Sequence, residues 1–246
     1  MDILRDIGVN IVVALIGFGI GWIWQRLRQW TKLRRARRFW RPFVTGGLQV
    51  VVGRFEFTQF QTPGCLGVGD AMGLAELRAY LESLGLRDFA VSYADCLDGD
   101  SLKTNLILIG GPQPNAISKE VITKINSTFR FGDSARIGSP IYDSLTGQPY
   151  APVTKPNSGE ILMDYGLILK ASNPFAPSKQ VLLIAGCFGY GTWAGVRFAI
   201  SKEFVTNQIV AEGKPLECVI ETDILRGTPQ DIRLRDLRPL EPPRGN

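Results

Sequence analysis

The stretch NLILIGGPQPNAISKEVITKINST, residues 105–128, contains the pattern that decides the predicted fold. Its beginning, NLILIGG, is a short, continuous apolar run that ends in two glycines, which is typical of a buried strand. The remainder, residues 116–128, is typical of an amphipathic helix. Its apolar positions recur on one helical face, at Ile117, Val121, Ile122 and Ile125. A buried strand, a glycine-containing loop and an amphipathic helix form the repeating unit of a parallel sheet.

The same alternation continues on both sides of this stretch. LQVVVG (48–53) predicts a strand, and AMGLAELRAYLESLG (71–85) predicts a helix with Asp70 as its N-cap. Further strands are predicted at residues 89–95, 161–171, 180–186 and 216–224, a helix at 192–204, and a hairpin or extended loop at 129–156. Strands that alternate with single helices favour right-handed crossovers. We therefore predict an α/β, Rossmann-like three-layer domain with a mainly parallel sheet over residues 48–226, followed by a Pro/Arg-rich tail over residues 227–246 that has little to pack.

The N-terminal region predicts a membrane anchor. IGVNIVVALIGFGIGWIW, from Ile7 to Trp24, has no ionisable side chain, and as a helix it would extend roughly 27 Å, close to the thickness of a bilayer core. A buried core helix is the alternative. Residues 1–25 are thus expected to be one transmembrane helix and residues 26–47 a basic juxtamembrane linker. One basic residue, Arg5, precedes the run and eight follow it by residue 41, which places the N-terminus outside and the domain in the cytoplasm, at the inner membrane. Gly17 and Gly21 have the spacing that favours helix association, so we expect a homo-oligomer.

The charge of the chain is concentrated next to this anchor. The formal net charge is +5, but residues 1–41 hold 9 of the 28 basic residues and 2 of the 23 acidic ones, which leaves a net charge of −2 for the remainder. Arg34, Arg35, Arg37 and Arg38 are therefore expected to contact anionic lipid headgroups. The rest of the chain has no basic surplus with which to bind a nucleic-acid duplex.

Composition also limits the chemistry. The chain has no histidine, which excludes a Ser-His-Asp or Cys-His apparatus and the common zinc sites. Its four cysteines are widely spaced and are expected to be reduced and packed. We expect no metal and no cofactor, and no catalytic residue is identified, although Glu56, Asp95 and Asp164 are the carboxylates nearest to predicted strand ends.

Three loops between a strand and a helix are rich in glycine, and in a parallel sheet they share one edge. Glycine lets a backbone approach a ligand, and a helix N-terminus presents free N–H groups to an anion. Alternatively, the glycines only make tight turns, Asn115 only caps its helix, and Arg197 is a solvated surface residue. The candidate ligand-binding residues are Gly67, Gly69, Asp70, Gly110, Gly111, Asn115, Gly189, Gly191, Thr192 and Arg197.

The loop after LQVVVG and the segment GYGTWAG, Gly189 to Gly195, are the residues on which a family resemblance rests. With a Rossmann-like domain around them, the chain resembles the CARF sensor domains of bacterial defence systems. The resemblance implies an antiviral sensor that binds cyclic oligoadenylates across a dimer. Trp193 stands where that family often has a lysine. The chain is also similar in general plan to TIR and nucleoside deoxyribosyltransferase-like domains, which cleave N-glycosidic bonds with a glutamate; Glu56 or Glu76 would have that role here.

These observations lead to one main hypothesis and two alternatives. The main hypothesis is a membrane-anchored sensor or effector that binds a nucleotide-like anionic ligand, for which a cyclic oligonucleotide is one candidate, and couples this to rearrangement of an oligomer. The first alternative is an enzyme that cleaves NAD or a nucleoside with carboxylates. The second is a structural or assembly protein that docks on another membrane complex.

Overall fold

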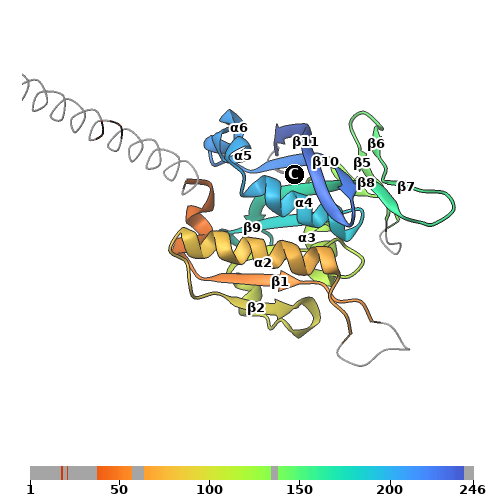
Figure 1. The fold of residues 1–246 in the computed structure, drawn as a ribbon. Coiled ribbons are helices and arrows are strands. Elements are labelled where there is room, and N and C mark those ends of the chain that lie inside the picture. Colours follow the sequence, from red (N-terminus) through yellow and green to blue (C-terminus); the bar gives the residue numbers. More distant parts are fainter. Residues whose placement is uncertain (1–17, 19–20, 22–37, 57–63, 134–137, 241–246) are drawn as a thin grey trace, which may run out of the picture.

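The computed structural model describes residues 18, 21, 38–56, 64–133 and 138–240, and contains one central sheet and a smaller one (Figure 1). The central sheet has the strand order β11-β10-β8-β9-β3-β1-β2, with β7 beside β8, and the smaller sheet has the order β4-β5-β6. The strands are β1 Leu48–Val52, β2 Ala90–Tyr93, β3 Asn105–Ile109, β4 Phe129–Phe131, β5 Ile141–Asp143, β6 Pro149–Tyr150, β7 Val153–Thr154, β8 Ile161–Asn173, β9 Ala176–Gly186, β10 Leu216–Leu225 and β11 Thr228–Pro239. The helices are α2 Val68–Ser83, α3 Ala116–Lys124, α4 Gly189–Ala199, α5 Lys202–Thr206 and α6 Gln208–Ala211, with short 3-10 turns η1 Ala94–Cys96 and η2 Ser101–Lys103.

Helices cover both faces of the central sheet, so the three-layer architecture is confirmed. Helices α2 and α4 lie side by side on one face, and α3 lies behind the sheet (Figure 1). Because successive strand residues point to opposite faces, β1 supplies both layers. Val50 and Val52 belong to the hydrophobic cluster under α2 and α4, whereas Val51 belongs to the cluster under α3.

The prediction of a mainly parallel sheet is wrong, because the sheet is mixed. The pairs β1–β2, β1–β3 and β3–β9 are parallel. The pairs β8–β9, β8–β10, β10–β11 and β7–β8 are antiparallel. Only Pro174 and Phe175 separate β8 from β9, which is too short for the crossover that a parallel pair needs. The parallel part is therefore one half of the sheet, and long hairpins form the other.

The predicted tail contains the edge strand β11. Arg226 and Gly227 join it to β10, and both have positive φ, as the two-residue turn of a tight hairpin requires. Its apolar residues Ile232, Leu234 and Leu237 pack against the core cluster. Arginines and aspartates between these positions conceal the alternation in the sequence. Thr228–Pro239 thus belongs to the folded domain, and only residues 241–246 of the predicted tail lie outside the described residues.

The predicted basic linker also contributes to the core. Residues 38–45 are helical, and the side chains of Phe39, Trp40 and Phe43 are at most 1% exposed. The Phe39 ring contacts the Phe204 ring edge-on, with 5.3 Å between centroids. The amide of Asn105 also donates a hydrogen bond of 2.9 Å to the Pro42 carbonyl oxygen. The domain therefore begins at least ten residues before the predicted boundary at residue 48.

The predicted transmembrane helix and the inner-membrane localisation are not supported. Among the helices of the described residues, none has the length and apolar composition that crossing a bilayer requires. Within Ile7–Trp24 only Phe18 and Gly21 are described, and Arg34, Arg35 and Arg37, which we expected to contact lipid, also lie outside the described residues.

Candidate functional site

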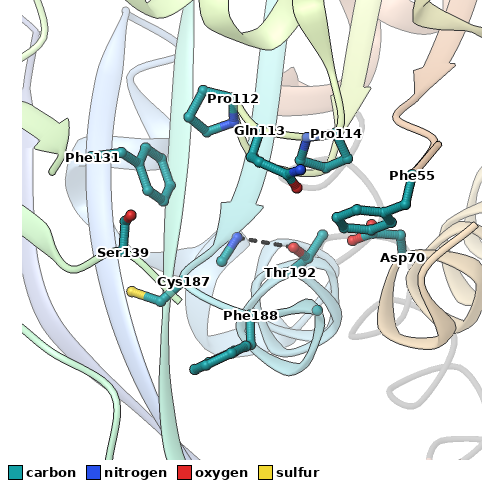
Figure 2. A pocket seen from close by; sticks show the side chains of 13 residues that line it. Phe55, Asp70, Pro112, Gln113, Pro114, Phe131, Ser139, Cys187, Phe188 and Thr192 are labelled. Atoms are coloured by element: carbon teal, nitrogen blue, oxygen red, sulfur yellow. Dashed lines mark hydrogen bonds between the residues drawn. The ribbon is translucent and has the colours of Figure 1, made fainter. Parts of the chain in front are cut away.

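The carboxyl ends of β1, β3 and β9 meet at one edge of the sheet because these strands are parallel. The chain leaves β1 towards α2 on one face and leaves β3 towards α3 on the other, which is the arrangement that opens a crevice in α/β sheets. A cavity of about 40 Å³ lies there (Figure 2). It is lined by Phe55, Asp70, Gly111, Pro112, Gln113, Pro114, Phe131, Ser139, Gly186, Cys187, Phe188, Gly189 and Thr192. We call this the edge pocket.

Several glycines around the edge pocket are explained by contact between loops. A Cβ atom on Gly69 would overlap the carbonyl oxygen of Gly189, so α2 and α4 meet at their first turns. A Cβ on Gly191 would overlap the carbonyl oxygen of Tyr165 in β8. Gly110 has a φ of +100°, which a side chain would strain. A tight turn at Gly110, as in the alternative interpretation, and close backbone packing at Gly69 and Gly191 account for these glycines without a ligand.

Asp164 occupies the N-terminus of α4 from within the protein. This carboxyl, fully buried in β8, accepts hydrogen bonds from the backbone N–H groups of Phe188, Gly191 and Tyr165. Burial raises the pKa of Asp164 to about 8, and the three N–H groups oppose that shift. We expected the free N–H groups at this helix N-terminus to face an external anion, but those of Phe188 and Gly191 bond to the internal Asp164 carboxyl. Asp164 orients the loop that forms the floor of the edge pocket.

Asp70 is the carboxyl that lines the edge pocket. It lies in the first turn of α2 and is 3% exposed, and the N-cap of α2 is Gly67, so the predicted capping role of Asp70 is wrong. The Thr192 hydroxyl forms a hydrogen bond with the Asp70 carboxyl, and its oxygen also accepts the Gly186 N–H at 2.9 Å. The second carboxyl oxygen, Oδ1, has no hydrogen-bond partner among the described residues. Desolvation raises the pKa of Asp70 to about 6.

The walls of the edge pocket are apolar and aromatic. Figure 2 shows the Phe55 ring beside Asp70, with Phe131 on the opposite side, Phe188 below, and Pro112 and Pro114 above. The small sheet that carries Phe131 is held to the central sheet by buried ionic hydrogen bonds. Glu217 of β10 accepts from the Ser127 hydroxyl at 2.7 Å, and Arg238 of β11 pairs with Asp143 at 2.8 Å. The described lining contains no lysine and no arginine.

Four of the ten predicted ligand-binding residues line the edge pocket, namely Asp70, Gly111, Gly189 and Thr192. Gly67, Gly69, Gly110 and Gly191 lie beside it and serve the packing of the loops. Asn115 caps α3 by accepting the Ser118 N–H at 3.0 Å, and its amide donates to the carbonyl oxygens of Val51 and Ile109. Capping was one of the two roles that the sequence allowed for it.

Arg197 and the carboxylates of the enzyme hypothesis are engaged elsewhere. Arg197 pairs with Glu76 at 2.9 Å and donates to the Pro229 carbonyl oxygen at 3.2 Å. Glu76 also accepts the indole N–H of Trp193 at 2.9 Å. Glu56 is exposed and pairs with Arg54, which also contacts Asp95. Neither glutamate lines the edge pocket.

Sequence reasoning did not select the aromatic walls. Phe55 and Phe131 lie in segments without a helical or strand period, and Phe188 lies within a glycine-rich loop. Among the described residues, no group of three Cys, Asp or Glu side chains is placed to hold a metal ion. The cysteines are unpaired; Cys187 and Cys218 are buried as expected, whereas Cys65 and Cys96 are exposed.

No family model matches the chain, and no curated protein matches it either. The chemistry of the edge pocket therefore has to be argued from its own atoms. They offer a carboxyl oxygen that needs a donor, a glutamine amide and aromatic surface, without a described cation. This set suits a flat ligand that donates hydrogen bonds.

Proposed function

We propose that this domain binds a nucleotide-like small molecule, with the edge of the base in the edge pocket and any phosphate outside it. The observation that carries the proposal is the Oδ1 atom of Asp70, a buried acceptor without a described partner at the carboxyl ends of three parallel strands. Buried polar atoms of native folds nearly always have a hydrogen-bond partner, so this carboxyl oxygen calls for a donor.

The size and lining of the pocket determine which part of the ligand enters. A cavity of about 40 Å³ holds only a few water molecules, whereas ligand sites usually have 300 to 1,000 Å³. The pocket therefore takes one edge of the molecule, and the rest lies against the surrounding loops. Phe55, Phe131 and Phe188 provide the aromatic surface on which bases stack. Without lysine or arginine in the described lining, the phosphate is not recognised inside the pocket.

Binding is tested on the purified chain by calorimetry and thermal shift against nucleosides, nucleotides, NAD and cyclic oligonucleotides. A ligand present at 100 times its Kd should stabilise the fold by about 2.7 kcal/mol. Asp70→Asn should abolish or strongly weaken the response. Glu82→Gln is the matched control, because it also neutralises one carboxylate of α2 but on the exposed surface, where Glu82 pairs with Arg78. No response to any member of the panel would reject the proposal.

The raised pKa of Asp70 favours a second candidate, an enzyme that uses this carboxyl as a general acid or base. A pKa of about 6 lies near the range in which a carboxyl can both give and take a proton at neutral pH. Chromatography of nucleosides and NAD incubated with the protein would show a free base if an N-glycosidic bond were cleaved. Unchanged substrates after prolonged incubation would leave binding as the function of the pocket.

A further inference from the structure

We propose that Asp70 makes the edge pocket select bases that present an exocyclic amino group, as adenine and cytosine do, over bases that present an oxo group in its place. This inference rests on the proposed function and names the part of the ligand that the pocket reads.

The first step is the hydrogen-bonding state of the carboxyl. Thr192 supplies one hydrogen bond to Asp70, and Oδ1 receives none from the described residues. Asp70 lines the edge pocket, so the pocket is the route by which a ligand donor approaches this carboxyl. An exocyclic amino group carries two N–H donors and is small enough for a cavity of about 40 Å³. An oxo group would instead set one acceptor against another.

The second step is the absence of a compensating charge. Asp70 is surrounded by Gly67 and Phe55 from the β1–α2 loop, Gly110 from the β3–α3 loop and Thr192 from α4, all of which are uncharged. Cys187 is the other titratable group of the lining, and burial raises the pKa of its thiol well above the ordinary value. The Asp164 carboxyl lies behind the β9–α4 loop and binds its N–H groups. No described cation in the lining pairs with Asp70, so the negative charge of the carboxylate is not neutralised before a ligand donor binds to it.

The third step is the proton. Above pH 6 the Asp70 carboxyl is mainly ionised and accepts, whereas below pH 6 it is mainly protonated and can donate to an oxo group. Selectivity for amino bases should therefore be large at pH 8 and smaller at pH 5. A merely structural carboxyl would give no such change in the ratio of two affinities.

Calorimetry on the full chain tests the inference with two matched ligand pairs, adenosine against inosine and cytidine against uridine. At pH 8 the amino member of at least one pair should bind 100-fold or more tightly than its oxo partner, because a site built to bond an N–H at one position rejects an analogue that places an acceptor there. At pH 5 the ratio should fall at least tenfold. Asp70→Asn, whose amide can donate as well as accept, should bring the ratio close to one, while Glu82→Gln should keep it.

The outcomes separate the two proposals. Equal affinities within both pairs at pH 8, or an unchanged ratio in Asp70→Asn, would overturn the selectivity and leave the binding proposal standing. No binding of either pair, with binding of another nucleotide-like compound, would overturn the selectivity alone. No binding of any nucleotide-like compound would overturn both. The pH comparison uses the unchanged protein, so it decides the matter even if Asp70→Asn fails to fold.

Discussion

Asp70 lowers the stability of the fold at neutral pH. Its pKa is about 6 in the folded state against 3.8 ordinarily, so the folded state holds its proton more tightly. The stabilisation that comes from holding this proton is fully present below pH 3.8 and is lost as the pH rises through 6. Above that pH the ionised, buried carboxyl makes the folded state about 3 kcal/mol less stable. We expect Asp70→Asn to raise the free energy of unfolding at pH 8 by up to this amount and to change it little at pH 4. Urea denaturation at both pH values measures this. An equal effect at both would show that ionisation of Asp70 is not the cause.

Lys170 also lowers the stability of the fold at neutral pH, because a positive charge is buried. Its ammonium, 1% exposed in β8, donates to the carbonyl oxygens of Phe39 and Gly213 at 3.4 and 3.3 Å and lies 4.5 Å from the centroid of the Phe39 ring. Burial lowers the pKa of Lys170 from 10.5 to about 8. The unfolded chain therefore binds more protons between pH 8 and 10.5, and stability rises with pH across that window.

Replacing this lysine should reveal the penalty. We expect Lys170→Met to stabilise the protein at pH 7 by as much as about 3 kcal/mol, because the charge no longer has to be buried. The gain should shrink as the pH approaches 10.5. Thermal unfolding of both proteins from pH 7 to pH 10 measures the trend. A gain that does not depend on pH would mean that packing of the methionine, and not charge burial, is responsible.

Single residues differ in how far their roles could be predicted. Asn115 follows a strand and precedes an apolar helical period, which suffices to predict a cap, and the structure confirms it. The position of Asp70 near a glycine-rich loop placed it among the candidates, but its burial depends on Phe55 and Thr192, which are far apart in the sequence. The pairing of Arg197 with Glu76 joins two helices, and helical period does not predict it.

At the scale of elements, the contact between the first turns of α2 and α4 sets the shape of the edge pocket. Gly69 lies against the backbone of Gly189, so an added Cβ cannot be accommodated by moving a side chain. We expect Gly69→Ala to destabilise the fold by about 2 kcal/mol or more. Gly99→Ala is the control, because Gly99 has no atom near its Cβ position and no positive φ. Urea denaturation compares the two, and similar small changes in both would mean that the helices can move apart freely.

Elements could be predicted better than their connections. Continuous apolar runs predict β1, β3 and β9, because these strands are buried on both faces. The helical period of apolar residues predicts α2 and α3, because each helix buries one side. Strand direction depends on connection length and on turn geometry. Pro174 and Phe175 form the turn between β8 and β9, and Arg226 and Gly227, both with positive φ, form the turn between β10 and β11. Neither turn has the common hairpin sequence Asn-Gly or Asp-Gly. The mixed sheet followed from these short turns.

For the whole molecule, the helical residues 38–45 decide where the domain begins. Phe39, Trp40 and Phe43 are among its largest fully buried side chains. Trp40→Ala should cost about 3 to 5 kcal/mol, which is a large part of the stability of a typical domain. A chain that starts at Leu48 should accordingly lack cooperative unfolding and bind a dye for exposed apolar surface, whereas one that starts at residue 38 should unfold cooperatively. Equal cooperativity of the two would show that the aromatic residues are dispensable.

The position of these aromatic residues also has a consequence for biosynthesis. Phe39 packs on Phe204, and Lys170 reaches back to the Phe39 carbonyl oxygen, so several contacts of the helical residues 38–45 join residues more than a hundred positions apart. A nascent chain exposes Phe39, Trp40 and Phe43 on the ribosome until most of the sequence has emerged. Closing such long segments is slow, since loop entropy is lost before the contacts form. The helical residues 38–45 are therefore synthesised well before Lys170 and Phe204, with which they pack, and their aromatic side chains stay exposed in that interval.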